Sequence, residues 1–201
     1  MTIEKGAAWG RTVPRPNDLV VAANDADVVT ALRDGRPVAP AAGDLHRTVG
    51  GRDSTDAAEL NELPIDLLAV TLDDGETRVA CAHVVVRQPW FRGGWWFGQV
   101  LMVMNAEFLG RWHVVARGHP NDGRVESCEW GRPLGIRQRI AARRRLPAGA
   151  HVPHPLIATR AFRQRTWEFE MPMVVRVDGV AAGRSRSLVI DVRPDAGVIY
   201  A

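Results

Sequence analysis

The hydrophobic pattern of residues 18–50 is that of a small α/β unit. The apolar run DLVVAA over residues 18–23 predicts a short strand, and DADVVTALRDG predicts a helix that ends at Gly35. A second short strand is expected over residues 37–41. Such a unit is too short to bury a core of its own. The polar stretch at residues 52–63 predicts a loop or one helical turn.

The pattern changes at Ile65, from where apolar, largely β-branched runs are separated by turn signals. Asp-Gly and Gly-Gly pairs between such runs indicate antiparallel hairpins, and the alternation in VVRV and LVIDV indicates one solvated face. We expect strands in the segments IDLLAVTL, RVACAHVVVRQPW, WWFGQVLMVMNAEFLG, WEFEMPMVVRV, RSRSLVIDV and VIYA. The segments DDGE, FRGG, DGVAAG and RPDAG are expected to be turns.

One segment interrupts this succession of predicted strands. LGIRQRIAARRRL, residues 134–146, predicts a short amphipathic basic helix. The fold class that follows is mainly β (α+β): an antiparallel β-sandwich over residues 52–201, preceded by a small α/β segment in residues 1–51.

Composition supports a globular protein, because 46% of the 201 residues are hydrophobic and 24% are charged. No apolar run approaches the roughly 20 residues of a membrane span, and the first residues lack the apolar core of a secretion signal. We therefore expect a cytoplasmic protein, with peripheral association at a membrane as an alternative. Cys81 and Cys128 lie far apart and outside any CxxC spacing, so we expect two buried free thiols.

The charge is mildly basic, with 26 Lys and Arg against 23 Asp and Glu, and every basic residue except Lys5 is arginine. The planar guanidinium binds phosphate oxygens bidentately, and a positive field favours anionic partners.

Two Asp-Gly turns carry candidate chemistry. The stretch HPNDGRVE at residues 119–126 places Asn121 and Asp122 before Gly123, which suits either an ordinary hairpin turn or an oxygen-ligand site for Mg²⁺. Asp178, before Gly179, likewise suits either an ordinary hairpin turn or an oxygen-ligand site, and a general base is an alternative functional role for it. By contrast, His151 and His154 are interleaved with prolines and have no identifiable third ligand, so we expect a structural turn.

Aromatic and basic clusters suggest an amphiphilic or anionic partner. Trp90, Phe91, Trp95 and Trp96 surround a Gly-Gly turn, where they suit a lipid pocket, a membrane surface or the core equally well. The second cluster consists of Arg137, Arg139, Arg143, Arg144 and Arg145. Lipid phosphates, nucleic acid and a merely solvated face all remain open for it.

The stretch RPVAPAAGDLHRTVGG, residues 36–51, has the layout of a phosphate-binding turn. A short apolar approach leads into small residues, then Asp44, then a helix-compatible segment closed by Gly50 and Gly51.

Several of these segments resemble, in order, the bacterial diacylglycerol kinase family, whose relatives include sphingosine kinases and NAD kinases. The resemblance lies in VMNAEFLGRWHVVARGHPNDGRVE, GAHVPHPLI and VVRVDGVAAGRSRSLVIDVRPDAGVIY. It implies a chain that joins a nucleotide-binding α/β domain to a β-sandwich lipid domain. It also implies a structural Mg²⁺ turn at Asp122 and a general base at Asp178, although Val180 stands where the family has a glutamate.

The N-terminal segment then reads as a truncated remnant of the nucleotide-binding domain, residues 1–51. In the family a strand leads into GGDGT and a helix, and a later strand leads into a Pro-x-Gly-Thr-Gly-Asn-Asp turn. DLVVAANDADVVTAL and PVAPAAGDLHRTVG occupy that order, and Asp25, Gly43 and Asp44 are retained. Ala23, Asn24 and Ala26 replace the glycines of the first loop and Asp27 its threonine; about seventeen residues precede its strand, leaving no room for the domain's first half.

These replacements remove what a phosphate loop needs, because a Cβ blocks close approach to backbone N–H groups and an added carboxylate repels phosphate. The resemblance therefore implies a degenerate, non-catalytic lipid-kinase-like protein for which ATP is not expected and Mg²⁺ is an option. We expect it to bind lipid, a membrane surface or an anionic partner, but not nucleic acid. The contact residues expected for this are Trp90, Trp95, Trp96, Arg143 and Arg144.

Two alternatives remain open. One is an active ATP-dependent diacylglycerol kinase completed by a homodimer or a partner chain. The other is a regulatory module that binds a true lipid kinase.

Overall fold

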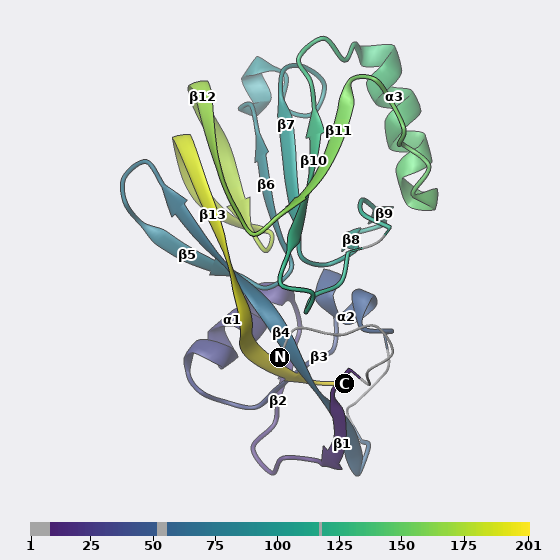
Figure 1. Ribbon diagram of the computed structural model, residues 1–201, viewed down its shortest axis with the longest axis vertical. Helices are drawn as coiled ribbons and strands as arrows, with labels where there is room; N and C mark the ends of the chain where they lie inside the picture. The colour runs from purple at the N-terminus through teal and green to yellow at the C-terminus, as the bar shows by residue number, and fades with distance from the viewer. Residues whose placement is uncertain (1–8, 52–55, 117) are drawn as a thin grey trace.

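The computed structural model describes residues 9–51, 56–116 and 118–201. Most of its regular structure is antiparallel strand, so the predicted mainly β fold is confirmed (Figure 1). The N-terminal elements are β1 (Arg11–Pro14), β2 (Val20–Ala22), α1 (Asp25–Arg33), β3 (Val38–Pro40) and α2 (Asp44–Thr48). The remaining strands are β4 (Glu59–Leu72), β5 (Thr77–Ala80), β6 (His83–Arg87), β7 (Val100–Met104), β8 (Phe108–Leu109), β9 (Trp112–His113), β10 (Val125–Trp130), β11 (Ile157–Phe162), β12 (Gln164–Val177) and β13 (Val180–Tyr200). The last helix is α3 (Ile136–Arg145), and two short 3₁₀ helices span Trp90–Arg92 and Leu146–Ala148.

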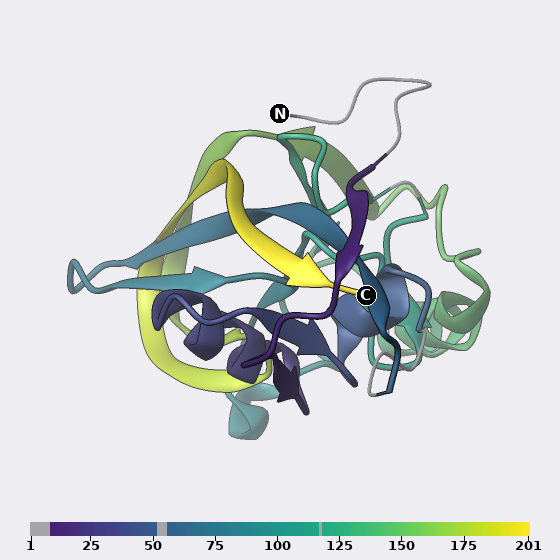
Figure 2. The same ribbon diagram turned by 90° about the horizontal axis from the view of Figure 1, so that it is seen from below.

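Nine strands form one continuous antiparallel sheet in the order β1-β4-β13-β12-β6-β7-β10-β11, with β5 added to β4. The sheet curls on itself, and β12 and β13 make the bend (Figure 2). Apolar side chains of β4 and β13, such as Leu68 and Ile190, share one core with those of β6 and β7, such as Val86 and Leu101. The predicted sandwich is therefore made by two halves of a single sheet.

The other face of β6, β7 and β10 is covered as well. A second core joins Val85 and Met102 to Leu134, Ala142 and Leu146 of the α3 segment. Both faces of β7 are therefore buried, which explains its uninterrupted apolar sequence VLMVM. The predicted basic helix over residues 134–146 is confirmed as α3 and the short 3₁₀ turn that follows it.

The N-terminal unit lies at one end of the sheet (Figure 1). β2 and β3 form a separate parallel pair, and α1 packs with them against Leu63, Ile65 and Ile199 of the large sheet. The unit thus shares its core with β4 and β13, as its small size requires. β1 belongs to the large sheet, because it pairs with β4. No helix in the described ranges is long and apolar enough to cross a bilayer.

Four local predictions are wrong. The expected strand WWFGQVLMVMNAEFLG is β7 and β8 only, and residues 95–99 before them are not strand. Of the stretch predicted as loop or helical turn at residues 52–63, residues 52–55 lie outside the described residues, and the part from Glu59 is strand, because β1 and β13 pair with it on both sides. The RPDAG segment is an irregularity within β13, not a chain reversal, since both flanks pair with β4. RVACAHVVVRQPW is two strands, interrupted at Cys81 and Ala82.

Candidate functional site

The loop between β2 and α1 is a helix cap. The Asp27 backbone N–H donates to the Asn24 side-chain oxygen at 2.9 Å, and the Asn24 side-chain amide donates to the Asp27 carboxylate at 2.7 Å. Asn is among the best N-cap residues, because its side chain accepts from the free amides of the first turn. Two of the residues that depart from the GGDGT pattern therefore stabilise the start of α1.

Asp25 points away from this cap and closes the second loop. Its carboxylate accepts the backbone N–H of Asp44 at 2.9 Å and that of Leu45 at 3.0 Å, at the first turn of α2. Gly43 has a φ of +104°, and a Cβ placed on it would lie 2.5 Å from an Asp25 oxygen. The glycine and the two amides of this phosphate-loop-like turn thus serve an internal carboxylate.

Asp44 holds the next link of this buried chain of polar groups. One of its oxygens accepts the Gly110 backbone N–H at 2.6 Å, and the other lies 3.2 Å from Nδ1 of His83. Asp25, Asp44 and His83 are 5%, 8% and 5% exposed, so their charges are almost completely removed from water. His83 was not singled out in the sequence, where it opens the apolar run HVVVR.

Asp178 lies beside this cluster and fixes the backbone around it. Its carboxylate accepts the backbone N–H groups of Cys81, Ala82 and His83 at 2.8, 3.0 and 2.8 Å, and its own N–H donates to the His83 carbonyl at 2.9 Å. These bonds hold the bend that separates β5 from β6. Asp178 has a φ of +46°, in the turn that joins β12 to β13. Its predicted role as a general base stays a prediction.

Burial and neighbouring carboxylates together set the protonation of this cluster. It raises the pKa of the Asp25 carboxyl to about 6; the amides of Asp44 and Leu45 oppose this shift, and the charges of Asp178 and Asp44 reinforce it. Burial disfavours the charged form of His83, but the carboxylates of Asp44, Asp178 and Asp25 outweigh it and raise the pKa of the ring.

The predicted Mg²⁺ turn is organised by Asp66, a residue that sequence reasoning missed because it sits inside the apolar strand β4. The buried Asp66 carboxylate accepts the N–H of Gly123 at 2.7 Å and that of Asp195 at 3.0 Å. Asp122 accepts the Arg124 N–H at 2.9 Å, and the buried side-chain oxygen of Asn121 has no described donor. One carboxylate and one free amide oxygen suit a largely hydrated Mg²⁺, so the site at Asp122 stays a prediction.

A pocket of about 520 Å³ lies beside His83, and we call it the arginine pocket. Its lining residues are His83, Val85, Arg87, Trp95, Leu109, Gly110, Arg111, Trp112, Arg143, Arg176 and Gly179. The guanidinium of Arg143 lies over the ring of Trp96 at 4.5 Å and over that of Trp112 at 5.0 Å. Within the described ranges, none of the four arginines is in ion-pair distance of a carboxylate.

The structure separates the predicted aromatic residues. Trp95 is partly buried and packs against the core, edge-on to Trp112 and Trp130, whereas Trp90 is 82% exposed and Trp96 is 42% exposed. Phe91 and Phe97 are also exposed, so this loop presents an aromatic surface next to the pocket. Of the four predicted aromatic residues, Trp95 packs against the core, and the other three lie on the surface.

The predicted arginine cluster on α3 also divides. Arg143 lines the arginine pocket, while Arg137, Arg144 and Arg145 are exposed outside it. Arg139 is fully buried and donates to the backbone carbonyls of Leu134, Trp95, Gly98 and Gly131. A buried guanidinium with four carbonyl partners is a structural element, so Arg139 does not belong to a binding face.

The sequence analysis did not identify three of the pocket residues, Arg87, Arg111 and Arg176, as candidates. Strand alternation was a usable signal for Arg87, because residues 83, 85 and 87 of β6 share one face of the sheet. Arg176 lies on β12 beside β6, where it pairs with Val85. Arg111 follows the β8 segment, and nothing in the sequence places it near the others.

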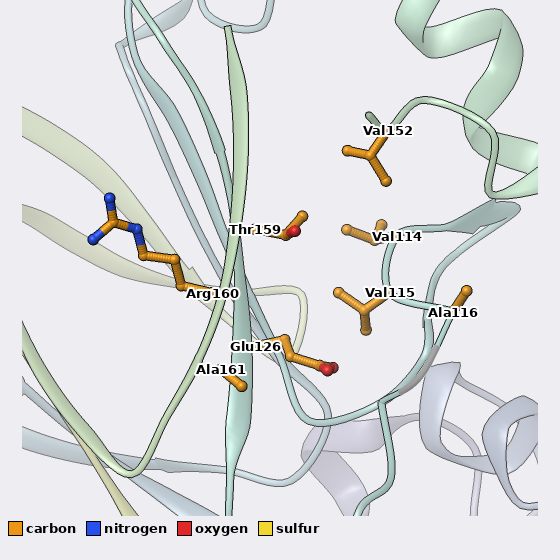
Figure 3. Close-up of a pocket in the computed structure, with 8 residues that line it drawn as sticks. All are labelled: Val114, Val115, Ala116, Glu126, Val152, Thr159, Arg160 and Ala161. Carbon is orange, nitrogen blue, oxygen red and sulfur yellow. The ribbon is translucent and has the colours of Figure 1, made fainter. Parts of the chain in front are cut away.

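A second pocket, of about 310 Å³, lies between β10, β11 and the segment 114–116 (Figure 3). Val114, Val115 and Val152 face Thr159 and Glu126 across it, whereas the Arg160 side chain points away (Figure 3). It is mainly apolar, and among the described residues that line it the basic side chain, Arg160, is directed away from the cavity. The remaining predicted site, His151 and His154, is a turn: the His154 ring accepts the Leu156 N–H at 3.1 Å, and His151 contacts Cys128. Cys81 and Cys128 are both buried free thiols, as predicted.

Comparison with solved structures identifies proteins of similar fold. No protein-family model and no curated protein matches the chain. A "putative diacylglycerol kinase" from Bacillus anthracis str. Sterne superposes with a TM-score of 0.63 at 11% identity, covering 90% of this chain and 77% of that chain. A diacylglycerol kinase structure from the same organism gives 0.60 at 13% identity, covering 90% and 75%. The chain therefore has a diacylglycerol-kinase-like fold.

Proposed function

We propose that this protein is a non-catalytic relative of lipid kinases that binds an anionic lipid in the arginine pocket. The observation that carries the proposal is the pocket itself, in which four guanidinium groups without carboxylate partners meet an apolar, aromatic wall. A pocket of this size and composition suits an amphiphile with one charged end.

The charge of the pocket favours a phosphate-bearing headgroup. Arg87 and Arg176 come from the paired strands β6 and β12, Arg111 lies between β8 and β9, and Arg143 lies on α3. Burial lowers the pKa of Arg143, and the positive charge of Arg111 lowers it further. An anion between them relieves this repulsion, and a guanidinium binds phosphate through two parallel hydrogen bonds.

The apolar parts of the site favour a lipid over a free phosphate. Val85, Trp95, Leu109 and Trp112 line the pocket with carbon surface that an acyl chain can cover. The exposed rings of Trp90 and Phe91 lie on the adjoining loop, where aromatic side chains can enter the headgroup region of a membrane.

Two features argue against phosphate transfer from ATP by this chain alone. The amides of Asp44 and Leu45, which a phosphate would need, are taken by the Asp25 carboxylate. Asp178 is engaged by three backbone N–H groups, so a role as proton acceptor competes with its role in holding the chain.

Vesicle co-sedimentation tests the proposal. We expect binding to phosphatidylcholine vesicles that contain phosphatidic acid, and at least tenfold weaker binding to phosphatidylcholine alone. The double variant Arg111→Gln/Arg176→Gln is expected to lose at least tenfold affinity. The double variant Arg132→Gln/Arg193→Gln is the matched control, because it removes the same two charges from arginines that already pair with Glu170 at 2.6 Å and Asp191 at 3.1 Å.

Four outcomes overturn the proposal. Equal binding to neutral vesicles, or undiminished binding by the double variant, removes the role of the pocket arginines. Full competition by millimolar inorganic phosphate assigns the site to free phosphate. Transfer of phosphate from ATP to diacylglycerol, abolished in Asp178→Asn, shows an active kinase.

A further inference from the structure

Three metal-ligating groups meet in a buried cluster next to the arginine pocket, which His83 also lines. Asp25, Asp44 and His83 each offer one ligand atom, and these atoms all lie within 4.8 Å of one another. No other set of three such groups is found in residues 9–51, 56–116 and 118–201. The three residues come from α1, α2 and β6, so the fold brings them together from distant parts of the chain.

His83 gives an independent reason to place a ligand here. Its Nδ1 is buried and makes no hydrogen bond to a described residue, although it points into the cluster and lies 3.2 Å from an Asp44 oxygen. That separation is within ion-pair distance, but its direction is not that of a hydrogen bond. Two ligands held at about 2.0–2.1 Å from a tetrahedral ion are about 3.3 Å apart, which is close to the observed spacing.

The two carboxylates are held in place by backbone amides. Asp25 is oriented by the N–H groups of Asp44 and Leu45, and Asp44 by that of Gly110. Each amide occupies one side of a carboxylate oxygen and leaves another lone pair available. Partners of this kind orient ligands and preorganise metal sites in proteins.

We propose that Asp25, Asp44 and His83 bind one divalent transition-metal ion, with Zn²⁺ as the preferred species. An imidazole together with two carboxylates suits Zn²⁺ better than Mg²⁺, which prefers oxygen ligands alone. Of the three ligands, His83 also lines the arginine pocket. Metal binding at this cluster does not depend on whether the pocket takes a lipid.

Metal titration of the full chain tests this site. After treatment with a chelator, we expect isothermal titration calorimetry and elemental analysis to show one Zn²⁺ per chain and a rise in the thermal midpoint. Mg²⁺ is expected to bind at least tenfold more weakly. His83→Gln and Asp44→Asn are each expected to lose at least tenfold in Zn²⁺ affinity.

Two controls and one wild-type measurement keep the test decisive. Asp122→Asn changes the predicted Mg²⁺ turn, and His154→Gln removes an imidazole elsewhere, so both are expected to retain Zn²⁺. In the wild type, Zn²⁺ is expected to shift the ring ¹⁵N resonances of His83, which requires no variant to fold. No saturable Zn²⁺ binding, unshifted His83 resonances, or binding lost in the controls but kept in His83→Gln overturns the site.

Discussion

The turn before α2 and the arginine pocket both present hydrogen-bond donors, but their acceptors differ. At the turn, the backbone amides of Asp44 and Leu45 receive the carboxylate of Asp25 from within the chain. In the pocket, four guanidinium groups have no carboxylate of the described chain beside them. Arg87 and Arg176 each donate one N–H to a backbone carbonyl, that of Gln88 and that of Gly179. Donors with an internal acceptor stabilise the fold, whereas the remaining guanidinium donors that line the cavity are available to a ligand.

The largest loss of stability is expected when Asp178 is replaced, because its carboxylate accepts three backbone N–H groups. Asp178→Ala leaves the N–H groups of Cys81, Ala82 and His83 without their acceptor and places alanine at a φ of +46°. We expect a loss of about 4 kcal/mol in the free energy of unfolding, measured by urea denaturation. Asp178→Asn keeps one acceptor oxygen and tolerates this backbone conformation, so its loss is expected to be smaller. Equal losses would contradict this explanation.

Gly43→Ala is expected to cost about 3 kcal/mol, because the new methyl group meets the Asp25 carboxylate at 2.5 Å and the residue has a φ of +104°. Gly50→Ala is the matched control, since its φ of +109° is similar and nothing lies within 4 Å of the new Cβ. We expect the control to lose only about 1 kcal/mol. If both variants unfold at the same urea concentration, close packing against Asp25 is not what requires the glycine.

The third prediction concerns the pH dependence of stability and the buried ring of His151, which lies outside both the turn before α2 and the arginine pocket. Burial and the neighbouring His113 lower the pKa of His151, whose Nδ1 lacks a hydrogen-bond partner among the described residues. The unfolded chain then binds more protons than the folded chain as pH falls through the ordinary pKa of histidine, so this group destabilises the fold at low pH. His151→Gln is expected to reduce the loss of stability between pH 7.5 and pH 5.5. An unchanged difference between the two pH values would show that His151 titrates normally.

The smallest effect on stability is expected in the pocket. Arg111→Gln and Arg176→Gln remove donors that have no carboxylate partner, so each is expected to change the free energy of unfolding by less than about 0.5 kcal/mol. Urea denaturation without lipid measures this. A loss above about 2 kcal/mol in either variant would mean that the arginine supports the fold, and the contrast with the turn before α2 would fail.

Local patterns were sufficient to predict most elements but not their ends. The 3.6-residue period of DADVVTALR predicts α1, and the β-branched runs predict strands, because both depend on neighbours in sequence. The bend at Cys81 was unpredictable from these neighbours. It depends on Asp178, which lies 97 residues further along the chain.

The candidate site was predictable only in part for the same reason. Asp25, Asp44 and Arg143 were candidates from the motifs, but their partners His83, Arg111 and Arg176 come from other elements. Arg139 and Arg143 lie one helical turn apart in one basic segment and have opposite surroundings. Which of the two is buried depends on carbonyls supplied by residues 95–98 and 131–134.

The buried guanidinium of Arg139 has a mechanical consequence. It fastens α3 to the carbonyls of Trp95 and Gly98 on the aromatic loop and to that of Gly131 at the end of β10. These hydrogen bonds therefore hold the helix that carries Arg143 and the loop that carries Trp96 in a fixed position relative to each other. A ligand in the arginine pocket therefore contacts, through Trp95 and Arg143, two segments that are held to each other, and lengthening either segment would loosen both.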